Sequence, residues 1–176
     1  LYIGAREMRI TQEVVAGIGG VRALRALGVR PAVWHLNEGH TAFLTLERIR
    51  ELAAGPGRRE GLTFDEAVET IAADTVFTTH TPVAEGNEAF SLELARRFLE
   101  PLCAPAGISV DDYLELGLDG MGTGRPFFSM TVLAIRMSRF RNGVSKLHGT
   151  VSRRMWQRLW PGFPADVMSI AVVTAT

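Results

Sequence analysis

Hydrophobic residues recur at spacings of three and four along most of this chain, which is the pattern of amphipathic helices. The first such stretch runs from Met8 to Leu27, and Gly28 is placed to end it. Glycines at positions 17, 19 and 20 weaken this helix, so we expect a break or very close packing there. The same spacing predicts further helices over residues 40–54, 63–72, 87–102, 109–116, 128–140 and 146–160.

Two segments have the composition of short buried strands. Residues 31–37 are mostly apolar and end in an Asn-Glu-Gly turn, whereas residues 75–79 are β-branched or aromatic and end before His80. The alternation of these strands with helices indicates an α/β fold with a parallel sheet, rich in helix and with few strands. Because two strands make a poor core by themselves, we expect them to belong to a larger sheet.

The composition is that of an ordinary globular protein and excludes several classes. Of the 176 residues, 47% are hydrophobic, which argues against a disordered chain. Lys and Arg together number 19, as do Asp and Glu, so bulk attraction to nucleic-acid phosphates is not expected. The single cysteine, Cys103, excludes a disulfide framework and fits the reducing cytoplasm. No stretch approaches the roughly 18 apolar residues of a membrane span, so we expect neither a nucleic-acid nor a membrane partner.

The polar residues that follow the two strands are the best candidates for chemistry. Glu38 and His40 follow the first strand, and His80 and Thr81 follow the second. Ligands of open α/β sheets bind outside the carboxyl ends of parallel strands. A carboxylate, imidazoles and hydroxyls suit a neutral, hydroxyl-rich ligand such as a sugar better than a phosphate. The alternative is that both histidines are ordinary polar residues at helix N-termini, and the pattern alone leaves both interpretations open.

A metal site is a weaker alternative at the same place. His35, Glu38 and His40 are possible zinc ligands, but their spacing matches neither H-E-x-x-H nor H-x-x-E-H. A metal-dependent hydrolase built on these three residues therefore competes with a structural histidine beside a functional turn.

Glycine-rich and basic segments give less specific signals. The glycines at 17–20 depart from the dinucleotide fingerprint, since position 22 is Arg and the preceding segment is helical, so close helix packing is favoured. Residues 117–124, followed by Arg125, are predicted to form a loop, either flexible beside a site or cradling an anion. Basic residues between 136 and 158 favour a solvated basic face or an interface.

Four segments, in this order and spacing, resemble the α-glucan phosphorylases of the compact bacterial and archaeal kind, which include glycogen, starch and maltodextrin phosphorylases. The segments are WHLNEGHTAF at 34–43, FTTHTPV at 77–83, MTVLA at 130–134 and NGVSKLHG at 142–149. The resemblance implies that residues 1–164 are part of the N-terminal Rossmann-like domain of a two-domain (GT-B-type) glycosyltransferase. It stops after Pro164, so residues 165–176 are expected to be a divergent tail. Together with Leu1 in place of an initiator Met, it implies a fragment of a longer enzyme.

The resemblance implies an activity, a cofactor and partners. Members of the family carry out reversible phosphorolysis, in which phosphate attacks the terminal α-1,4 bond of a glucan and glucose 1-phosphate is released with retained configuration. Pyridoxal phosphate sits at their active site, between the two domains. The expected ligands are therefore an α-1,4-glucan and phosphate or glucose 1-phosphate, and the parent enzyme is expected to be a cytoplasmic homodimer.

The resemblance also assigns site residues. His80 corresponds to the active-site histidine, whose main-chain carbonyl accepts a hydrogen bond from the 6-hydroxyl of the glucosyl unit, and Thr81 lines the same pocket. Glu38 and His40 correspond to the acid and the histidine beside the β-face of the sugar.

Asn142, Gly143 and Val144 correspond to a tight turn that brings backbone to the sugar and the cofactor. Nothing in this sequence matches the region that carries the cofactor lysine and the phosphate-binding basic residues, so no cofactor-binding residue is assigned. The chain on its own is therefore expected to be inactive, and a non-catalytic glucan-binding or pseudo-enzyme module is the main alternative.

Overall fold

The computed structural model describes residues 2–53, 61–81, 87–120, 124–159 and 170–172. Residues 121–123 of the glycine-rich stretch, the expected helix end at residue 160 and most of the expected tail lie outside these ranges. Among the described residues, every helix is too short or too polar to cross a membrane.

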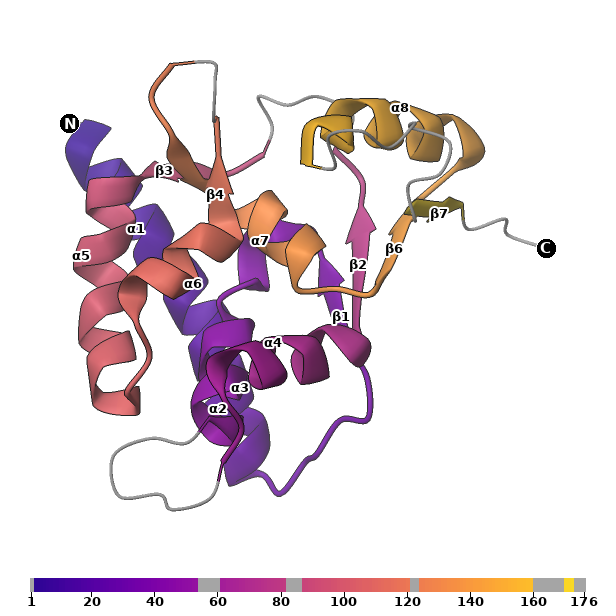
Figure 1. Ribbon diagram of the computed structural model, residues 1–176. Helices are drawn as coiled ribbons and strands as arrows, with labels where there is room; N and C mark the ends of the chain where they lie inside the picture. The colour runs from indigo at the N-terminus through magenta and orange to yellow at the C-terminus, as the bar shows by residue number, and fades with distance from the viewer. Residues whose placement is uncertain (1, 54–60, 82–86, 121–123, 160–169, 173–176) are drawn as a thin grey trace.

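A four-stranded parallel sheet confirms the α/β class (Figure 1). Its strands, in spatial order, are β1 (Trp34–Asn37), β2 (Thr75–Thr79), β6 (Phe140–Gly143) and β7 (Ile170–Val172). In this register Asn37 lies opposite Thr78, and Thr78 lies opposite Asn142. Because all four strands run the same way, their carboxyl ends share one edge of the sheet.

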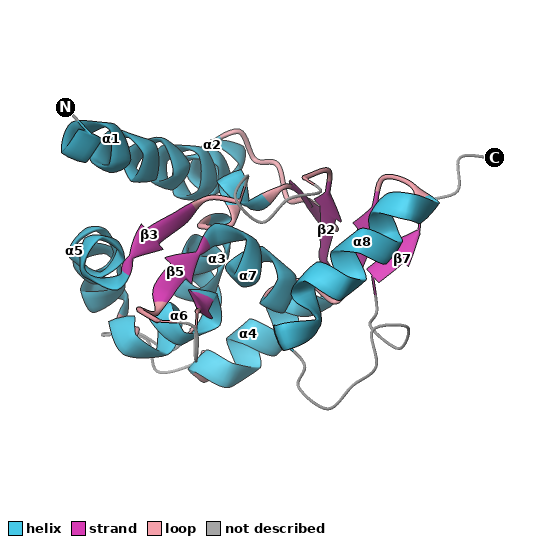
Figure 2. Cartoon of the chain, turned by 90° about the horizontal axis from the view of Figure 1, so that it is seen from above, coloured by secondary structure: helices cyan, strands magenta, loops and turns pink. Residues whose placement is uncertain are grey.

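Helices and a small antiparallel sheet pack beside the parallel sheet. The helices are α1 (Tyr2–Val14), α2 (Gly20–Ala26), α3 (Leu44–Leu52), α4 (Phe64–Ala73), α5 (Leu92–Cys103), α6 (Val110–Gly117), α7 (Met130–Arg136) and α8 (Lys146–Trp156). The second sheet has the order β3 (Ala89–Ser91), β5 (Phe127–Ser129) and β4 (Leu118–Asp119). Figure 2 shows α1 and α2 as nearly one rod at one side of the molecule and α8 beside β7 at the other.

The glycine-rich stretch of the first helix is a point of close packing. A π-helical turn, Val15–Gly19, joins α1 to α2. A Cβ added at Gly17 would lie 2.7 Å from the backbone nitrogen of Leu44 and 2.9 Å from the carbonyl carbon of Phe43. The rod therefore touches the start of α3, as the packing interpretation expected. Gly28, with φ of +74°, ends the rod as predicted.

Substitution of Gly17 by alanine is expected to lower the free energy of unfolding by about 1–3 kcal/mol, because the backbone of α3 must shift to admit the methyl group. Gly20 is the matched control, since nothing lies within 4 Å of a Cβ there. Gly20→Ala is expected to stabilise the helix by about 0.5–1 kcal/mol. Urea unfolding of the two variants measures both values, and equal effects at the two positions would contradict the packing argument.

Several predicted boundaries are correct because local side chains set them. Thr63 and Glu66 form the predicted capping box, in which the Thr63 backbone nitrogen donates to Glu66 Oε2 at 2.8 Å. Strand β2 has the predicted bounds, and Ser109 caps α6.

Other boundaries were predicted wrongly, and the number of strands was too low. Residues 89–91, placed in a helix from the sequence, form β3, and Ser91 caps α5 instead. The helix predicted over 128–140 is shorter, because its two ends belong to β5 and β6. The segment 141–144, expected to be a connecting turn, mostly lies in β6. These strands are three or four residues long, and each pairs with at least one strand that lies far away in the sequence.

Candidate functional site

The carboxyl edge of the parallel sheet brings together the polar residues that follow β1 and β2. Glu38 comes directly after β1, and His80 and Thr81 come directly after β2. The two strands are neighbours, and the backbone nitrogen of Glu38 donates to the carbonyl oxygen of Thr78 at 3.0 Å. The strand-end argument from the sequence therefore places these three residues correctly beside one another.

The carboxylate of Glu38 is the centre of this arrangement. Its Oε1 accepts hydrogen bonds from the backbone nitrogen of His80, from the backbone nitrogen of Thr81 at 2.8 Å and from Thr81 Oγ1 at 3.2 Å. Its side chain is only 13% exposed, whereas that of His80 is 47% exposed. The carboxylate therefore fixes the backbone on both sides of His80, and Nδ1 of the half-exposed His80 ring lies 3.5 Å from the same oxygen.

The backbone at Glu38 has a conformation that ordinary residues avoid. Its φ is +64° and its ψ is −174°, a region populated almost only by glycine. A Cβ added at the next residue, Gly39, would lie 2.9 Å from the carbonyl carbon of Met130 and from the backbone nitrogen of Thr131. Close packing against the start of α7 therefore holds the strained turn in place. Strained backbone of this kind is common at functional sites, where it fixes the orientation of a side chain.

A line of hydrogen bonds crosses three strands just below this edge. His35 Nε2 lies 2.6 Å from Thr78 Oγ1, and Thr78 Oγ1 donates to Asn142 Oδ1 at 2.9 Å. Asn142 and Gly143 thus lie in strand β6, which corrects the expectation of a tight turn at these positions, and Val144 follows them as an exposed residue. A Cβ at Gly143 would lie 2.8 Å from the backbone nitrogen of Gly149, so β6 approaches α8 closely.

His40 belongs to a different cluster from Glu38 and His80. Its Nδ1 lies 3.2 Å from the Arg9 guanidinium and 3.7 Å from Glu13 Oε1, both on α1. His35 is bonded instead to Thr78. In the described part of the chain, no group of three or more His, Cys, Asp or Glu residues could hold a metal ion. The metal-dependent alternative on His35, Glu38 and His40 therefore loses its structural basis.

Glu13 is a buried acid that the sequence reasoning missed. It is 2% exposed, and neither carboxylate oxygen has a hydrogen-bond partner. Its pKa is raised to about 8, first by burial and then by the negative charge of Glu88, against the opposing charge of Arg9. A signal was present, because Glu13 follows Ile10 by three residues and so lies on the buried stripe of its helix.

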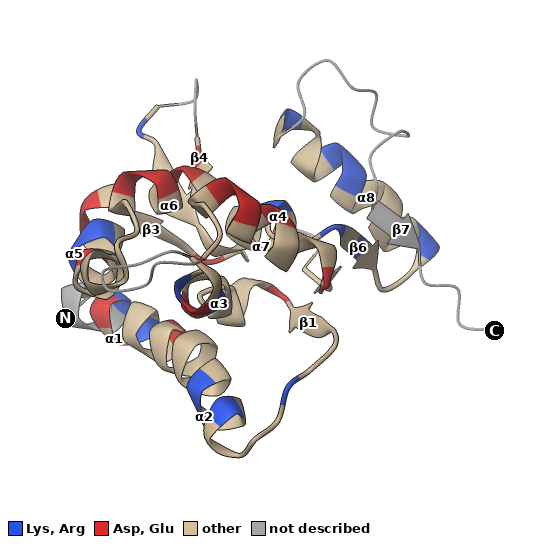
Figure 3. Ribbon diagram, turned by 60° about the horizontal axis from the view of Figure 1, so that its bottom comes forward, with Lys and Arg blue, Asp and Glu red and all other residues tan. Residues whose placement is uncertain are grey.

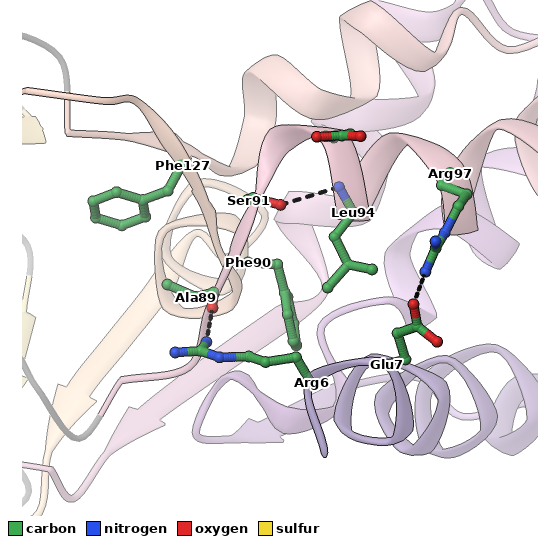
Figure 4. Close-up of a pocket in the computed structure, with 9 residues that line it drawn as sticks. Arg6, Glu7, Ala89, Phe90, Ser91, Leu94, Arg97 and Phe127 are labelled. Atoms are coloured by element: carbon green, nitrogen blue, oxygen red, sulfur yellow. Dashed lines mark hydrogen bonds and ion pairs between the residues drawn. The ribbon is translucent and has the colours of Figure 1, made fainter. Parts of the chain in front are cut away.

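A hollow of about 750 Å³ lies away from the strand ends, between α1, β3 and α5 (Figure 4). Phe90, Leu94 and Phe127 give it an apolar lining. Arg6 donates to the carbonyl oxygen of Ala89 at 2.5 Å beside it. None of the sequence-predicted site residues lines this hollow.

The sign of the charge differs from helix to helix (Figure 3). Acidic residues gather on α4 and α6, and α8 carries basic ones. However, some basic residues of the C-terminal third bind other groups of the same chain. Arg158 Nε donates to Asp119 Oδ1 at 3.0 Å and, against the effect of burial, holds the pKa of that carboxyl below its usual value. Arg141 Nε donates to the carbonyl oxygen of Ile135 at 2.6 Å, so the expected basic face is smaller than the sequence indicates.

Comparison with known proteins gives several relatives. The chain is 43% identical over 175 residues to the maltodextrin phosphorylase of Thermococcus litoralis, and 42% identical over 185 residues to the glycogen phosphorylase of Mycobacterium tuberculosis. It is 32% identical over 160 residues to the glycogen phosphorylase of Aquifex aeolicus. No family model matches the chain.

The alignments show how much of each protein is shared. The first two take in 99% of this chain, and therefore run on past Pro164, whereas the third takes in 91%. They cover 20–22% of the relatives, so the chain spans about a fifth of their length. This chain is thus homologous, over nearly its whole length, to a stretch that makes up about a fifth of the glycogen and maltodextrin phosphorylases.

Proposed function

We propose that this chain supplies part of the glucosyl-binding side of an α-glucan phosphorylase, within the N-terminal Rossmann-like domain of a GT-B-type enzyme. In this proposal the domain takes in residues 1–164 and also strand β7, because β7 pairs with β6 and the alignments run on past Pro164, so the divergent tail expected at residues 165–176 is not kept. The reaction is attack of inorganic phosphate on C1 of the terminal α-1,4-linked glucosyl unit. A C1–O bond to phosphate forms, the glycosidic C1–O bond breaks, and the leaving 4-oxygen takes up a proton.

The observation that carries the proposal is the fixed peptide at the end of β2. Glu38 Oε1 accepts from the backbone nitrogens of both His80 and Thr81. Such a peptide is pre-organised, so its polar groups need no rearrangement when charge develops on the sugar. In the proposed mechanism the main-chain carbonyl of His80 accepts a hydrogen bond from the 6-hydroxyl, and Thr81 lines the same pocket.

Glu38 has a positioning role in this mechanism. Its Oε1 accepts hydrogen bonds from donors of residues 80 and 81, so the residue orients the sugar-binding peptide. Asn142, Gly143 and Val144 are proposed to bring the end of β6 to the same sugar. Their neighbour in the sheet, Thr78, ties Asn142 to β2.

Pyridoxal phosphate is proposed as the cofactor of the parent enzyme, where it would supply proton-transfer chemistry through its phosphate group. The residues of this chain do not fit its covalent attachment. The only lysine in the sequence, Lys146, is exposed at the first turn of α8, outside any buried pocket of the described residues. We therefore derive no catalytic step through the cofactor from this chain.

A chimera tests the proposal. In the chimera, this chain replaces the matching stretch of the Thermococcus litoralis maltodextrin phosphorylase. The purified chimera is incubated with maltoheptaose and phosphate, and the release of glucose 1-phosphate is measured. We expect glucose 1-phosphate to form, and we expect Glu38→Gly to lower the rate by roughly 100-fold, because the peptide at His80 is released.

The control is the 176-residue chain by itself, mixed with maltoheptaose, phosphate and pyridoxal phosphate. It is expected to release no glucose 1-phosphate and to show no heat of binding in calorimetry. A chimera that melts cooperatively yet makes no product would contradict the proposal. Binding of maltoheptaose by the chain alone would favour the non-catalytic glucan-binding module instead.

A further inference from the structure

A second polar cluster, on the α1 side of the turn after β1, is not used by the mechanism above. It joins Arg9 and Glu13 of α1, His40 of the short 3₁₀ helix Gly39–Thr41, and Glu88, which precedes β3. Arg9 Nε lies 2.9 Å from Glu88 Oε2 and 3.6 Å from Glu13 Oε1. His40 thus faces a cation and a buried acid that lie one helical turn apart.

The contact with Arg9 determines where the His40 ring carries its proton. The terminal guanidinium nitrogen of Arg9 lies 3.2 Å from His40 Nδ1. A guanidinium has donors and no acceptor, so Nδ1 must accept this hydrogen bond and cannot carry a proton itself. A neutral ring with this contact therefore carries its proton on Nε2.

The free nitrogen of the ring is available to a ligand. The His40 side chain is 51% exposed. Within the described residues, nothing accepts a hydrogen bond from Nε2. An Nε2–H group directed to solvent is a donor, and a sugar hydroxyl oxygen is an acceptor of matching chemistry.

Glu13 supports the same state of the ring. Its Oε1 lies 3.7 Å from His40 Nδ1, and neither of its oxygens is hydrogen-bonded. An ionised carboxylate at this place would attract a proton onto Nδ1 and so compete with Arg9. Burial and the nearby charge of Glu88 keep the acid protonated at neutral pH, with a pKa of about 8, and the competition is absent.

The other charges around the cluster do not alter this picture. Glu88 is paired with Arg9, and it also lies 3.7 Å from the guanidinium of Arg6. Among the residues that the structure describes, the charged and titratable groups around Glu13 are Arg9 on its own helix, His40, and Glu88 with its partner Arg6.

We propose that Arg9 and Glu13 are positioning residues that hold His40 as the neutral Nε2–H tautomer, so that the ring donates a hydrogen bond to a hydroxyl oxygen of the bound sugar. The choice of a sugar as the ligand rests on the proposed function. The tautomer does not, because it follows from the contacts within this chain.

Nitrogen-15 NMR of the imidazole rings tests the tautomer without any sugar. The 176-residue chain contains 4 histidines, and His40→Asn identifies the relevant signals. At pH 7 we expect a bare Nδ1 and a protonated Nε2. Across pH 8, where Glu13 ionises, we expect proton density to move towards Nδ1. A proton on Nδ1 at pH 7, or a ring that does not change across pH 8, overturns the proposal.

Variants separate the two positioning residues. Glu13→Gln keeps a neutral side chain, so the tautomer at pH 7 should persist while the change near pH 8 disappears. Arg9→Met removes the donor and should give a mixture of both tautomers. Glu7→Gln is the matched control on the same helix, because Glu7 pairs with Arg97, and it should leave His40 unchanged. If a variant does not fold, the titration of the unmodified chain still decides the question.

The role towards a sugar is tested in the chimeric enzyme. Loss of the ring's hydrogen bond is expected to raise KM for maltoheptaose roughly tenfold in His40→Phe, with a smaller change in kcat. Arg9→Met should raise KM less, roughly in proportion to the share of rings that leave the Nε2–H form. An unchanged KM overturns the sugar contact. If the chimera is inactive but His40 has the expected tautomer, the proposed function and the sugar contact are refuted, while the positioning of His40 by Arg9 and Glu13 is not. Failure of the proposed function can therefore be distinguished from failure of the positioning.

Discussion

Replacement of Glu38 by alanine is expected to lower the free energy of unfolding of this chain by about 2–4 kcal/mol, because hydrogen bonds to a charged group each contribute roughly 1.5–3 kcal/mol. The substitution removes the acceptor of the backbone nitrogens of His80 and Thr81. The residues after β2 then lose their side-chain tie to the turn after β1, whereas the backbone pairing of the two strands remains. Urea unfolding measures the change in stability, and amide hydrogen exchange at His80 and Thr81 reports the loss of the tie directly.

Glu38→Gly is the matched variant. It removes the same carboxylate, but glycine adopts the backbone conformation of this position without strain. At Glu38 φ is +64° and ψ is −174°, which costs a residue with a Cβ about 1–3 kcal/mol. Glycine relieves this strain, so Glu38→Gly is expected to be more stable than Glu38→Ala by about 1 kcal/mol or more. Both variants should expose the two amides equally. Equal stability of the two variants, or amides that stay protected, would show that the turn is neither strained nor held by the carboxylate.

Raising the pH from 4 to 9 is expected to remove about 5 kcal/mol of stability through Glu13 alone. Its pKa is about 8 in the folded chain against an ordinary value of 4.5. Below 4.5 the acid is protonated in both states. Between the two values the unfolded chain releases the proton while the folded chain retains it, so stability falls by about 1.4 kcal/mol per pH unit. Above pH 8 the acid is ionised in both states and the loss is complete.

Glu13→Gln provides the reference for this measurement, because glutamine does not titrate. The free energy of unfolding is measured by urea for both proteins from pH 4 to 9, and the difference between the curves isolates Glu13 from other groups. Asp119, for example, has a lowered pKa and acts in the opposite direction at the acid end. The two curves should diverge steadily as the pH rises from 4.5 to 8. Parallel curves would mean that Glu13 is solvated or paired in the folded chain.

The parts of the fold that were predictable depend on local chemistry. The capping box of Thr63 and Glu66 and the β-branched strand 75–79 are set by neighbouring residues, and both lie where the sequence places them. The short strands β3, β5 and β6 have no such local signal. They form because distant segments pair with them. The β-propensity of a segment of a few residues contains no information about such partners.

The candidate site divides in the same way. Parallel strands end at a common edge, so the sequence by itself determined that Glu38 would meet His80 and Thr81. It did not determine that one carboxylate oxygen would bind both amides, or that His40, two residues further on, would turn towards α1. It also placed Glu13 on a buried stripe without showing that the acid lies there with no hydrogen-bond partner. Strand ends follow from chain order, whereas the partner of a side chain and the pKa of a buried acid depend on which distant groups surround it, and only the tertiary structure decided those.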